Sequence, residues 1–119
     1  MSLRRERTRR RVKTKNKSLK LKTFRSFSEV QKALNSFSVT CLEITNQYLE
    51  NIKKQDSLNA FIEIYKEEAL NSAKLIDKKI KQKKAGRLAG MVIAVKDNIC
   101  YSGHKVSAAS KILDGFESL

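Results

Sequence analysis

Hydrophobic residues recur at the spacing of an α-helix in three parts of the sequence, and short polar breaks separate these parts. In the first part, either Ser26 with Glu29 or Ser28 with Gln31 can form a capping box, in which side chains satisfy the free backbone N–H groups of a helix start. We therefore expect a short helix that ends near residues 35–36. The apolar residues that share one face of this helix are Val30, Ala33 and Leu34.

A second and clearer helix is predicted over residues 39–54. Thr40 and Glu43 provide a further capping box at its start, and the polar residues 55–57 follow its end. The apolar positions that repeat at helical spacing are Cys41, Ile44, Tyr48 and Ile52.

A third helix is predicted over residues 66–84. Lysines crowd its C-terminal end, where positive charge complements the helix dipole, and Gly86 is the expected stop. The repeating apolar positions are Ala69, Ala73, Ile76 and Ile80.

Two other segments have the pattern of β-strands. Residues 59–65 alternate in character and are rich in β-branched and aromatic side chains. Residues 91–95 are apolar without alternation, which is typical of a strand that is covered on both faces in an α/β sheet. The helices and strands together predict an α/β fold.

Lys96 directly follows the second predicted strand. Sites in open α/β sheets lie just beyond the carboxyl ends of strands, and a partly desolvated lysine at such a place can accept a proton from a nucleophilic hydroxyl. On the pattern alone, a Lys96–Asp97 pair that ends a strand and turns into solvent is the commoner explanation. For Asp97 we expect capping of a following turn rather than orientation of Lys96.

The positive charge of the 119-residue chain is concentrated at its N-terminus. Residues 1–22 carry +10 of the net +14, so the rest of the chain is only mildly basic. Like charges and few apolar side chains predict a disordered basic tail over 1–22 and a folded part over 23–119. The tail fits either nonspecific binding to phosphate backbones or a plain disordered extension, and it has no aromatic residues for base stacking.

The remaining candidates carry little chemistry. Cys41 and Cys100 have no nearby metal-type ligands, and we expect Cys100 to pack against the sheet. His104 is expected to be a surface residue without partners. No apolar run is long enough for a membrane span and no secretory signal is present, which predicts a cytoplasmic protein. No motif for a bound nucleotide or metal appears.

Four segments resemble the start of the amidase-signature family, over roughly residues 24–119 and most weakly before Asn59. The strongest is Leu88–Cys100 (LAGMVIAVKDNIC), which is similar to a family block that ends in Lys-Asp-Asn. It has Val92 where many members have proline, and a β-branched residue suits a strand. The other segments are Leu58–Ile62, Glu68–Leu70 and Ala109–Leu113 (ASKIL), the last as in A subunits of tRNA-dependent amidotransferases.

This resemblance implies a fold and a reaction. The fold is N-terminal helices plus the first strands of a mixed sheet, which this length leaves incomplete. Lys96 matches the base of a Ser–cis-Ser–Lys triad that hydrolyses glutamine and releases ammonia. The two serines lie downstream in the family, and neither Ser107 nor Ser110 has their Gly/Ser-rich context. The fragment is therefore expected to be inactive alone.

The resemblance also implies partners. These are B and C subunits in a heterotrimer, with glutamine as the substrate and Glu-tRNA(Gln) reached through the complex. ATP and Mg²⁺ belong to the partner subunit, so no cofactor or metal site is expected in this chain. Two alternatives stay open: a fragment of a stand-alone amide hydrolase, and a small basic RNA-binding protein that is anchored by residues 1–22.

Overall fold

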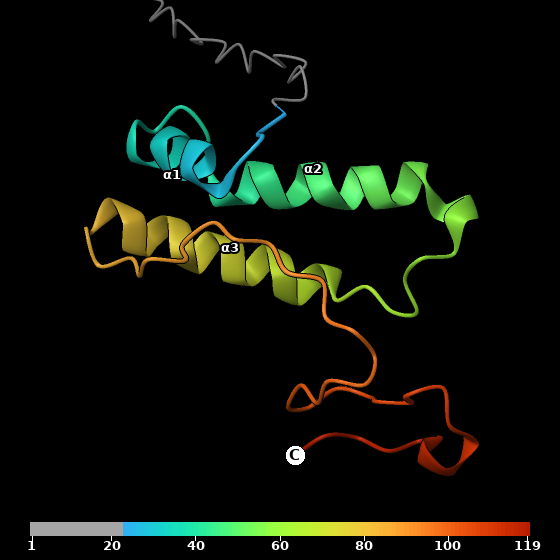
Figure 1. Ribbon diagram of the computed structural model, residues 1–119. Coiled ribbons are helices and arrows are strands. Elements are labelled where there is room, and N and C mark those ends of the chain that lie inside the picture. Colours follow the sequence, from blue (N-terminus) through green and yellow to red (C-terminus); the bar gives the residue numbers. More distant parts are fainter. Residues whose placement is uncertain (1–22) are drawn as a thin grey trace, which may run out of the picture.

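The computed structural model describes residues 23–119, and the predicted tail over residues 1–22 lies outside the described part (Figure 1). All three predicted helices are present, and two short 3₁₀ turns accompany them. No helix in the described part is both long and apolar enough to cross a bilayer. The helices are α1 (Phe27–Asn35), α2 (Cys41–Lys54) and α3 (Lys66–Lys81), and the 3₁₀ turns are η1 (Asp56–Leu58) and η2 (Lys111–Leu113).

The starts of α1 and α2 are set by capping residues in the sequence. The Ser26 hydroxyl accepts a hydrogen bond from the backbone N–H of Glu29, so the first of the two alternative caps is the one used for α1. Thr40 and Glu43 form the complete capping box at the start of α2. Each cap satisfies a backbone donor that has no partner inside its own helix.

Asp77 of α3 completes the start of α2 from outside the helix. Its carboxylate oxygens accept the backbone N–H groups of Cys41 at 2.7 Å and Leu42 at 3.2 Å. A carboxylate at a helix N-terminus is also favoured by the helix dipole. Asp77 therefore fixes the position of α3 against α2 by polar contacts as well as by packing.

The core lies where α1 meets the paired helices α2 and α3, which run side by side in Figure 1. The predicted apolar faces of α1 and of the first turns of α2 are buried. Tyr48 is an exception because it is 51% exposed, so its predicted place in the core is wrong. The buried cluster is Val30, Ala33, Leu34, Val39, Cys41, Ile44 and Ala73.

Two helices end at bulky residues in the left-handed backbone conformation. Phe37 follows α1 with φ of 53°, and Lys83 follows α3 with φ of 56°. In both cases the backbone hydrogen bonds are those of a Schellman motif, in which this position is usually glycine. The prediction that Gly86 stops α3 is therefore wrong, because the helix has already closed at Lys81.

The two predicted strands are absent from the described part of the chain, so the α/β assignment is wrong for residues 23–119. Residues 59–65 form an irregular link to α3, and Ile62 is 81% exposed. Residues 91–95 are also exposed and carry no strand assignment. A strand needs a neighbour for its backbone N–H and C=O groups, and no other described segment lies in register with either run. The mixed sheet is not formed here.

The chain returns along α3 and then forms an irregular C-terminal segment (Figure 1). Near α1, the Gln31 side chain donates to the backbone carbonyl of Arg87, and Gly90 packs against Leu34. Further on, an isolated antiparallel bridge between Lys105 and Glu117 closes residues 101–119 into a loop. This loop lies beside the start of α3 and carries most of the candidate site.

Candidate functional site

An open cavity of about 840 Å³ lies between the link to α3 and the C-terminal segment. Its lining comes from residues 60–65, 94–99, 101–109 and 113–116. Lys96, Asp97 and His104 are all on its wall, so groups that can exchange protons face one concave space. Concave sites with a few convergent polar groups are the usual places for small-molecule binding.

Lys96 is exposed, and its side chain makes no ion pair or hydrogen bond with any described residue. It was predicted to stand at the end of a covered strand, and that support is absent because residues 91–95 are themselves exposed. The backbone around it is nevertheless turned, since the N–H of Ile99 donates to the carbonyl of Lys96 at 2.9 Å. The amine of Lys96 is thus accessible from the cavity.

Asp97 is held by a turn ten residues further along the chain. Its carboxylate accepts the Ser107 hydroxyl at 2.5 Å and the Ser107 backbone N–H at 3.2 Å. These bonds from Ser107 lower the pKa of the Asp97 carboxyl from its ordinary value of 3.8, and the backbone N–H groups of Ala108 and Ala109 act in the same direction. Successive N–H groups in a turn form a concavity that binds anions. Asp97 has the turn-capping role that we expected.

The turn that receives Asp97 has an unusual backbone. The backbone N–H of Ser110 donates to the carbonyl of Ser107 at 2.8 Å, and the two central residues, Ala108 and Ala109, have φ of 45° and 55°. This is the pattern of a type I′ turn, which ordinarily takes glycine or asparagine. Left-handed conformations cost an L-residue about 1–2 kcal/mol each. The contacts of Asp97 offset part of this cost.

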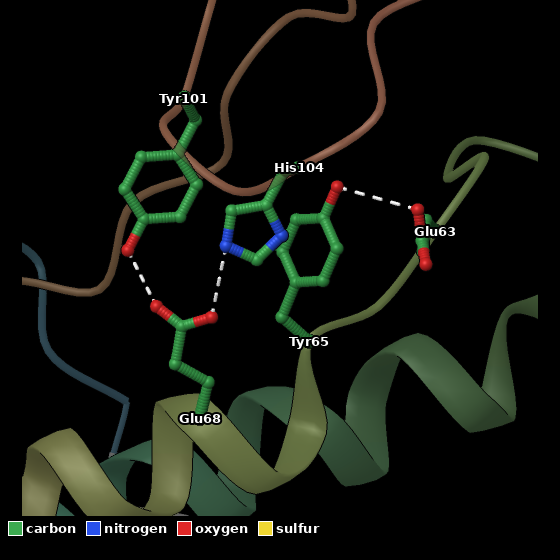
Figure 2. Close-up of polar contacts among 5 residues, drawn as sticks. All are labelled: Glu63, Tyr65, Glu68, Tyr101 and His104. Carbon is green, nitrogen blue, oxygen red and sulfur yellow. Dashed lines mark hydrogen bonds and ion pairs between the residues drawn. The ribbon is translucent and has the colours of Figure 1, made fainter. Parts of the chain in front are cut away.

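His104 belongs to a cluster of aromatic and acidic residues beside the same cavity (Figure 2). Its ring stacks on Tyr101 at 4.3 Å and lies 4.0 Å from the ring of Tyr65. Its Nε2 lies 3.0 Å from a carboxylate oxygen of Glu68, and the other oxygen of Glu68 accepts the Tyr101 hydroxyl at 2.5 Å. The expectation of an unpartnered surface histidine is therefore wrong: the side chain is only 17% exposed.

The carboxylates raise the pKa of both tyrosines in this cluster. For Tyr101 the main cause is the hydrogen bond to Glu68, together with the charge of that carboxylate. For Tyr65 the main cause is desolvation, followed by the charge and hydrogen bond of Glu63. Because both hydroxyls stay protonated, they act as hydrogen-bond donors. The cluster joins α3 to the C-terminal segment.

The two cysteines have opposite surroundings. Cys41 is buried, and this desolvation, together with the nearby Asp77 carboxylate, raises the pKa of its thiol to about 12. Cys100 is exposed, so the prediction that it packs against a sheet is wrong. Within residues 23–119, His, Cys, Asp and Glu form no group of three that could hold a metal ion.

Sequence patterns indicated Lys96 and Asp97 but missed the cluster around His104. Tyr65, Glu68, Tyr101 and His104 are up to 39 positions apart, and no local period links them. The only signal was weak: an acidic first turn of α3, and a tyrosine and a histidine that flank a glycine turn. Ser107 and Ser110 are not brought to Lys96, and Ser107 is engaged with Asp97.

Comparison with known proteins gives a consistent family. The amidase family profile matches residues 43–118. The chain is similar to the A subunits of glutamyl-tRNA(Gln) amidotransferase from three organisms: Chlorobaculum parvum, at 39% identity over 81% of this chain, Cenarchaeum symbiosum, at 45% over 78%, and Salinibacter ruber, at 38% over 79%. It spans only about a fifth of the length of these relatives, 20%, 19% and 18% respectively. No solved structure gives a significant match to the chain.

Proposed function

This chain belongs to the amidase family, and on that premise we propose that it is the N-terminal part of the glutamine-hydrolysing subunit of a glutamyl-tRNA(Gln) amidotransferase. The observation that carries the proposal is the similarity to curated A subunits over about four-fifths of the chain, 81% in one case. It includes the block that ends in Lys96–Asp97–Asn98. The activity requires a longer polypeptide, since the relatives extend well beyond the matched part.

In this proposal Lys96 is the general base of the reaction. Its neutral amine accepts a proton from a bridging serine, which in turn accepts the proton of a second, nucleophilic serine. The nucleophile attacks the side-chain amide carbon of glutamine, ammonia leaves, and water hydrolyses the resulting acyl-enzyme. Both serines come from the part of the relatives that this chain does not cover. The accessible amine of Lys96 on the cavity wall supports this role.

The anchoring of Asp97 supports a positioning role next to the base. The carboxylate is bound by the Ser107–Ala109 turn, so the backbone at residue 97 is held at two sides. A fixed backbone limits the places that the adjacent lysine side chain can reach, and catalytic geometry is sensitive to shifts of about 1 Å. Asp97 therefore acts through Lys96 rather than on the substrate.

We also propose that residues 91–95 become a sheet strand when the remaining polypeptide is present. The run is apolar and exposed in the described chain, with Ile93 at 68% exposure, and its backbone groups are free to pair. Pairing would cover the run and exclude water from the amine of Lys96. Loss of water favours the uncharged form of an amine, which is the form that accepts a proton.

The wider assignments follow from the same proposal. The ammonia would pass to a partner subunit that amidates Glu-tRNA(Gln) with ATP and Mg²⁺, in a complex with B and C subunits and in the cytoplasm. The chain itself is expected to hold no cofactor. The name that its relatives share supports these points.

A chimera tests the proposal directly. Residues 23–119 replace the matching N-terminal fifth of the Chlorobaculum parvum relative, and ammonia release from glutamine is measured for the purified complex. The chimera should hydrolyse glutamine, whereas the isolated 119-residue chain should release no ammonia above background. Lys96→Ala in the chimera should reduce the rate by at least about 10³-fold, the scale on which loss of a general base acts.

The matched control is Lys53→Ala, which removes an exposed lysine in the last turn of α2, away from the cavity. This variant should retain activity. A folded chimera whose Lys96→Ala variant still releases ammonia at the original rate would refute the assignment of Lys96. Comparable rates with acetamide and with glutamine would favour the alternative, a general amide hydrolase.

A further inference from the structure

The C-terminal half of α3 carries a dense group of positive side chains that the proposed glutamine chemistry does not use. Between residues 74 and 87 there are seven basic residues and one acid, Asp77. All seven basic side chains are exposed, and none forms an ion pair with a described residue. They are Lys74, Lys78, Lys79, Lys81, Lys83, Lys84 and Arg87.

The single acid in this stretch does not neutralise them. The carboxylate of Asp77 is committed to the backbone N–H groups of Cys41 and Leu42 at the start of α2. Asp77 is therefore turned towards the core side of α3, among the helix's buried contacts. The exposed side of this half of the helix is left with positive charge only.

Three of the lysines form a stripe along the helix. Lys74, Lys78 and Lys81 are spaced by four and three residues, so they share one face, at the side of the apolar face of Ala73. At 1.5 Å per residue the stripe is about 10 Å long, which is the rise of about three phosphates along one nucleic-acid strand. Complementing the helix dipole requires charge only in the last turn, and Lys74 lies before it.

The basic surface continues past the end of the helix. Lys83 occupies the left-handed position of the Schellman motif, with φ of 56°, and Lys84 follows it. A lysine at this position costs more than the usual glycine, and it places a further charge where the helix carbonyls end. In Figure 1 this end of α3 lies on the side of the molecule that holds α1.

We propose that this lysine face, residues 74–87, binds the phosphate backbone of a folded RNA. Several exposed lysines at phosphate spacing, with no acid among them on the exposed side, fit a polyanion better than a small ligand or an apolar protein surface. The choice of RNA over other polyanions rests on the proposed function, because the relatives are named for a tRNA-linked reaction. The positive face itself does not depend on that assignment.

The test measures binding of the full 119-residue chain to a fluorescent RNA hairpin with a stem of about 16 base pairs, the length that a small duplex-RNA-binding domain covers. Binding is followed by anisotropy over a series of salt concentrations. Three triple variants, each of which removes three positive charges, are compared, and circular dichroism confirms that each keeps its helices. The variants are Lys74→Gln/Lys78→Gln/Lys81→Gln, Lys53→Gln/Lys54→Gln/Lys66→Gln, and Arg9→Gln/Arg10→Gln/Arg11→Gln.

The stripe variant should weaken binding about tenfold or more at low salt and reduce the slope of log K against log salt by about two to three, one step for each lost phosphate contact. The control variant at residues 53, 54 and 66 should change affinity less than about twofold. Equal losses in all three variants, or a loss confined to the variant at residues 9–11, would overturn the proposal.

Two further probes separate RNA from other polyanions. A DNA duplex of the same length and vesicles with anionic lipid are titrated under the same conditions. Tighter binding to either probe, with the same dependence on Lys74, Lys78 and Lys81, would overturn the assignment to RNA. None of these measurements requires glutamine hydrolysis, so failure here is distinct from failure of the amidase assignment.

Discussion

The carboxylate of Asp97 accepts both the hydroxyl and the backbone N–H of Ser107, so the residue next to Lys96 is tied to a turn ten positions away. The turn is strained at Ala108 and Ala109, and the carboxylate holds their backbone groups together. The loop that carries the proposed base is thus organised by a neighbouring acid and not by a sheet.

Asp97→Asn should loosen this turn while leaving the size of the side chain unchanged. The amide cannot supply the negative charge that draws three successive N–H groups together. We expect faster amide hydrogen exchange at residues 107–109, and little change in the protection of α2, measured by NMR at neutral pH. Ser107→Ala should have a similar but smaller effect, because the backbone N–H of residue 107 remains.

The same contact predicts a pH dependence. Because the folded pKa of Asp97 lies below its ordinary value of 3.8, the ionised carboxylate stabilises the fold above that value. This contribution is lost as the pH falls through the folded pKa. The urea midpoints of the parent and Asp97→Asn chains should therefore differ near neutral pH and converge below about pH 3. A difference that persists unchanged at low pH would contradict the role of the charge.

The bond from Tyr101 to Glu68 should contribute measurably to attaching the C-terminal segment to α3. Tyr101→Phe removes a hydroxyl that lies 2.5 Å from a carboxylate, and it should lower the free energy of unfolding by about 1 kcal/mol. The matched control is Tyr65→Phe, whose hydroxyl lies 3.3 Å from Glu63 at an exposed site, so a smaller loss is expected. Equal losses in urea denaturation would show that ring contacts, and not the short bond, hold the segment.

The helical part of the fold could be predicted because its signals are local. Capping residues such as Thr40 with Glu43, and apolar spacing within each helix, act over a few positions, and the structure follows them. The strand at 91–95 could not be realised because pairing is a property of two segments, and the described chain offers no second one. Strand propensity alone does not supply a partner.

The candidate site was predictable only in part, for the same reason. Lys96 and Asp97 stand out because an apolar run ends at them. The contact of His104 with Glu68 joins a loop to a helix 36 positions earlier, and no periodicity encodes it. The left-handed backbone at Ala108 and Ala109 was equally hidden, since alanine is a residue that ordinarily avoids it.

Gly90→Ala should be strongly destabilising. The residue has φ of 87°, and an added Cβ would lie 2.3 Å from Leu34 Cδ1 in the core. Backbone strain and overpacking together should cost about 2 kcal/mol or more in urea denaturation. Gly86→Ala is the control, because nothing lies within 4 Å of its added Cβ, and its effect should stay within about 0.5 kcal/mol.

The two cysteines should react differently with a thiol reagent near pH 8. Cys100 is exposed, whereas the thiol of Cys41 is buried and has its pKa raised to about 12. The folded chain should therefore be modified at Cys100 alone, and at both thiols after unfolding. Mass spectrometry of the alkylated chain distinguishes these results. Rapid modification of Cys41 in the folded chain would show that α1 and α2 separate readily.

Asp77 has a consequence for the order in which the chain assembles. The first turn of α2 obtains two of its backbone acceptors from a residue that lies 35 and 36 positions later, so the beginning of one helix is completed by the middle of another. Until α3 docks, that turn has only its own capping box and should fray. The two helices therefore form as one cooperative unit, and α2 cannot mature ahead of its neighbour while the polypeptide is being synthesised.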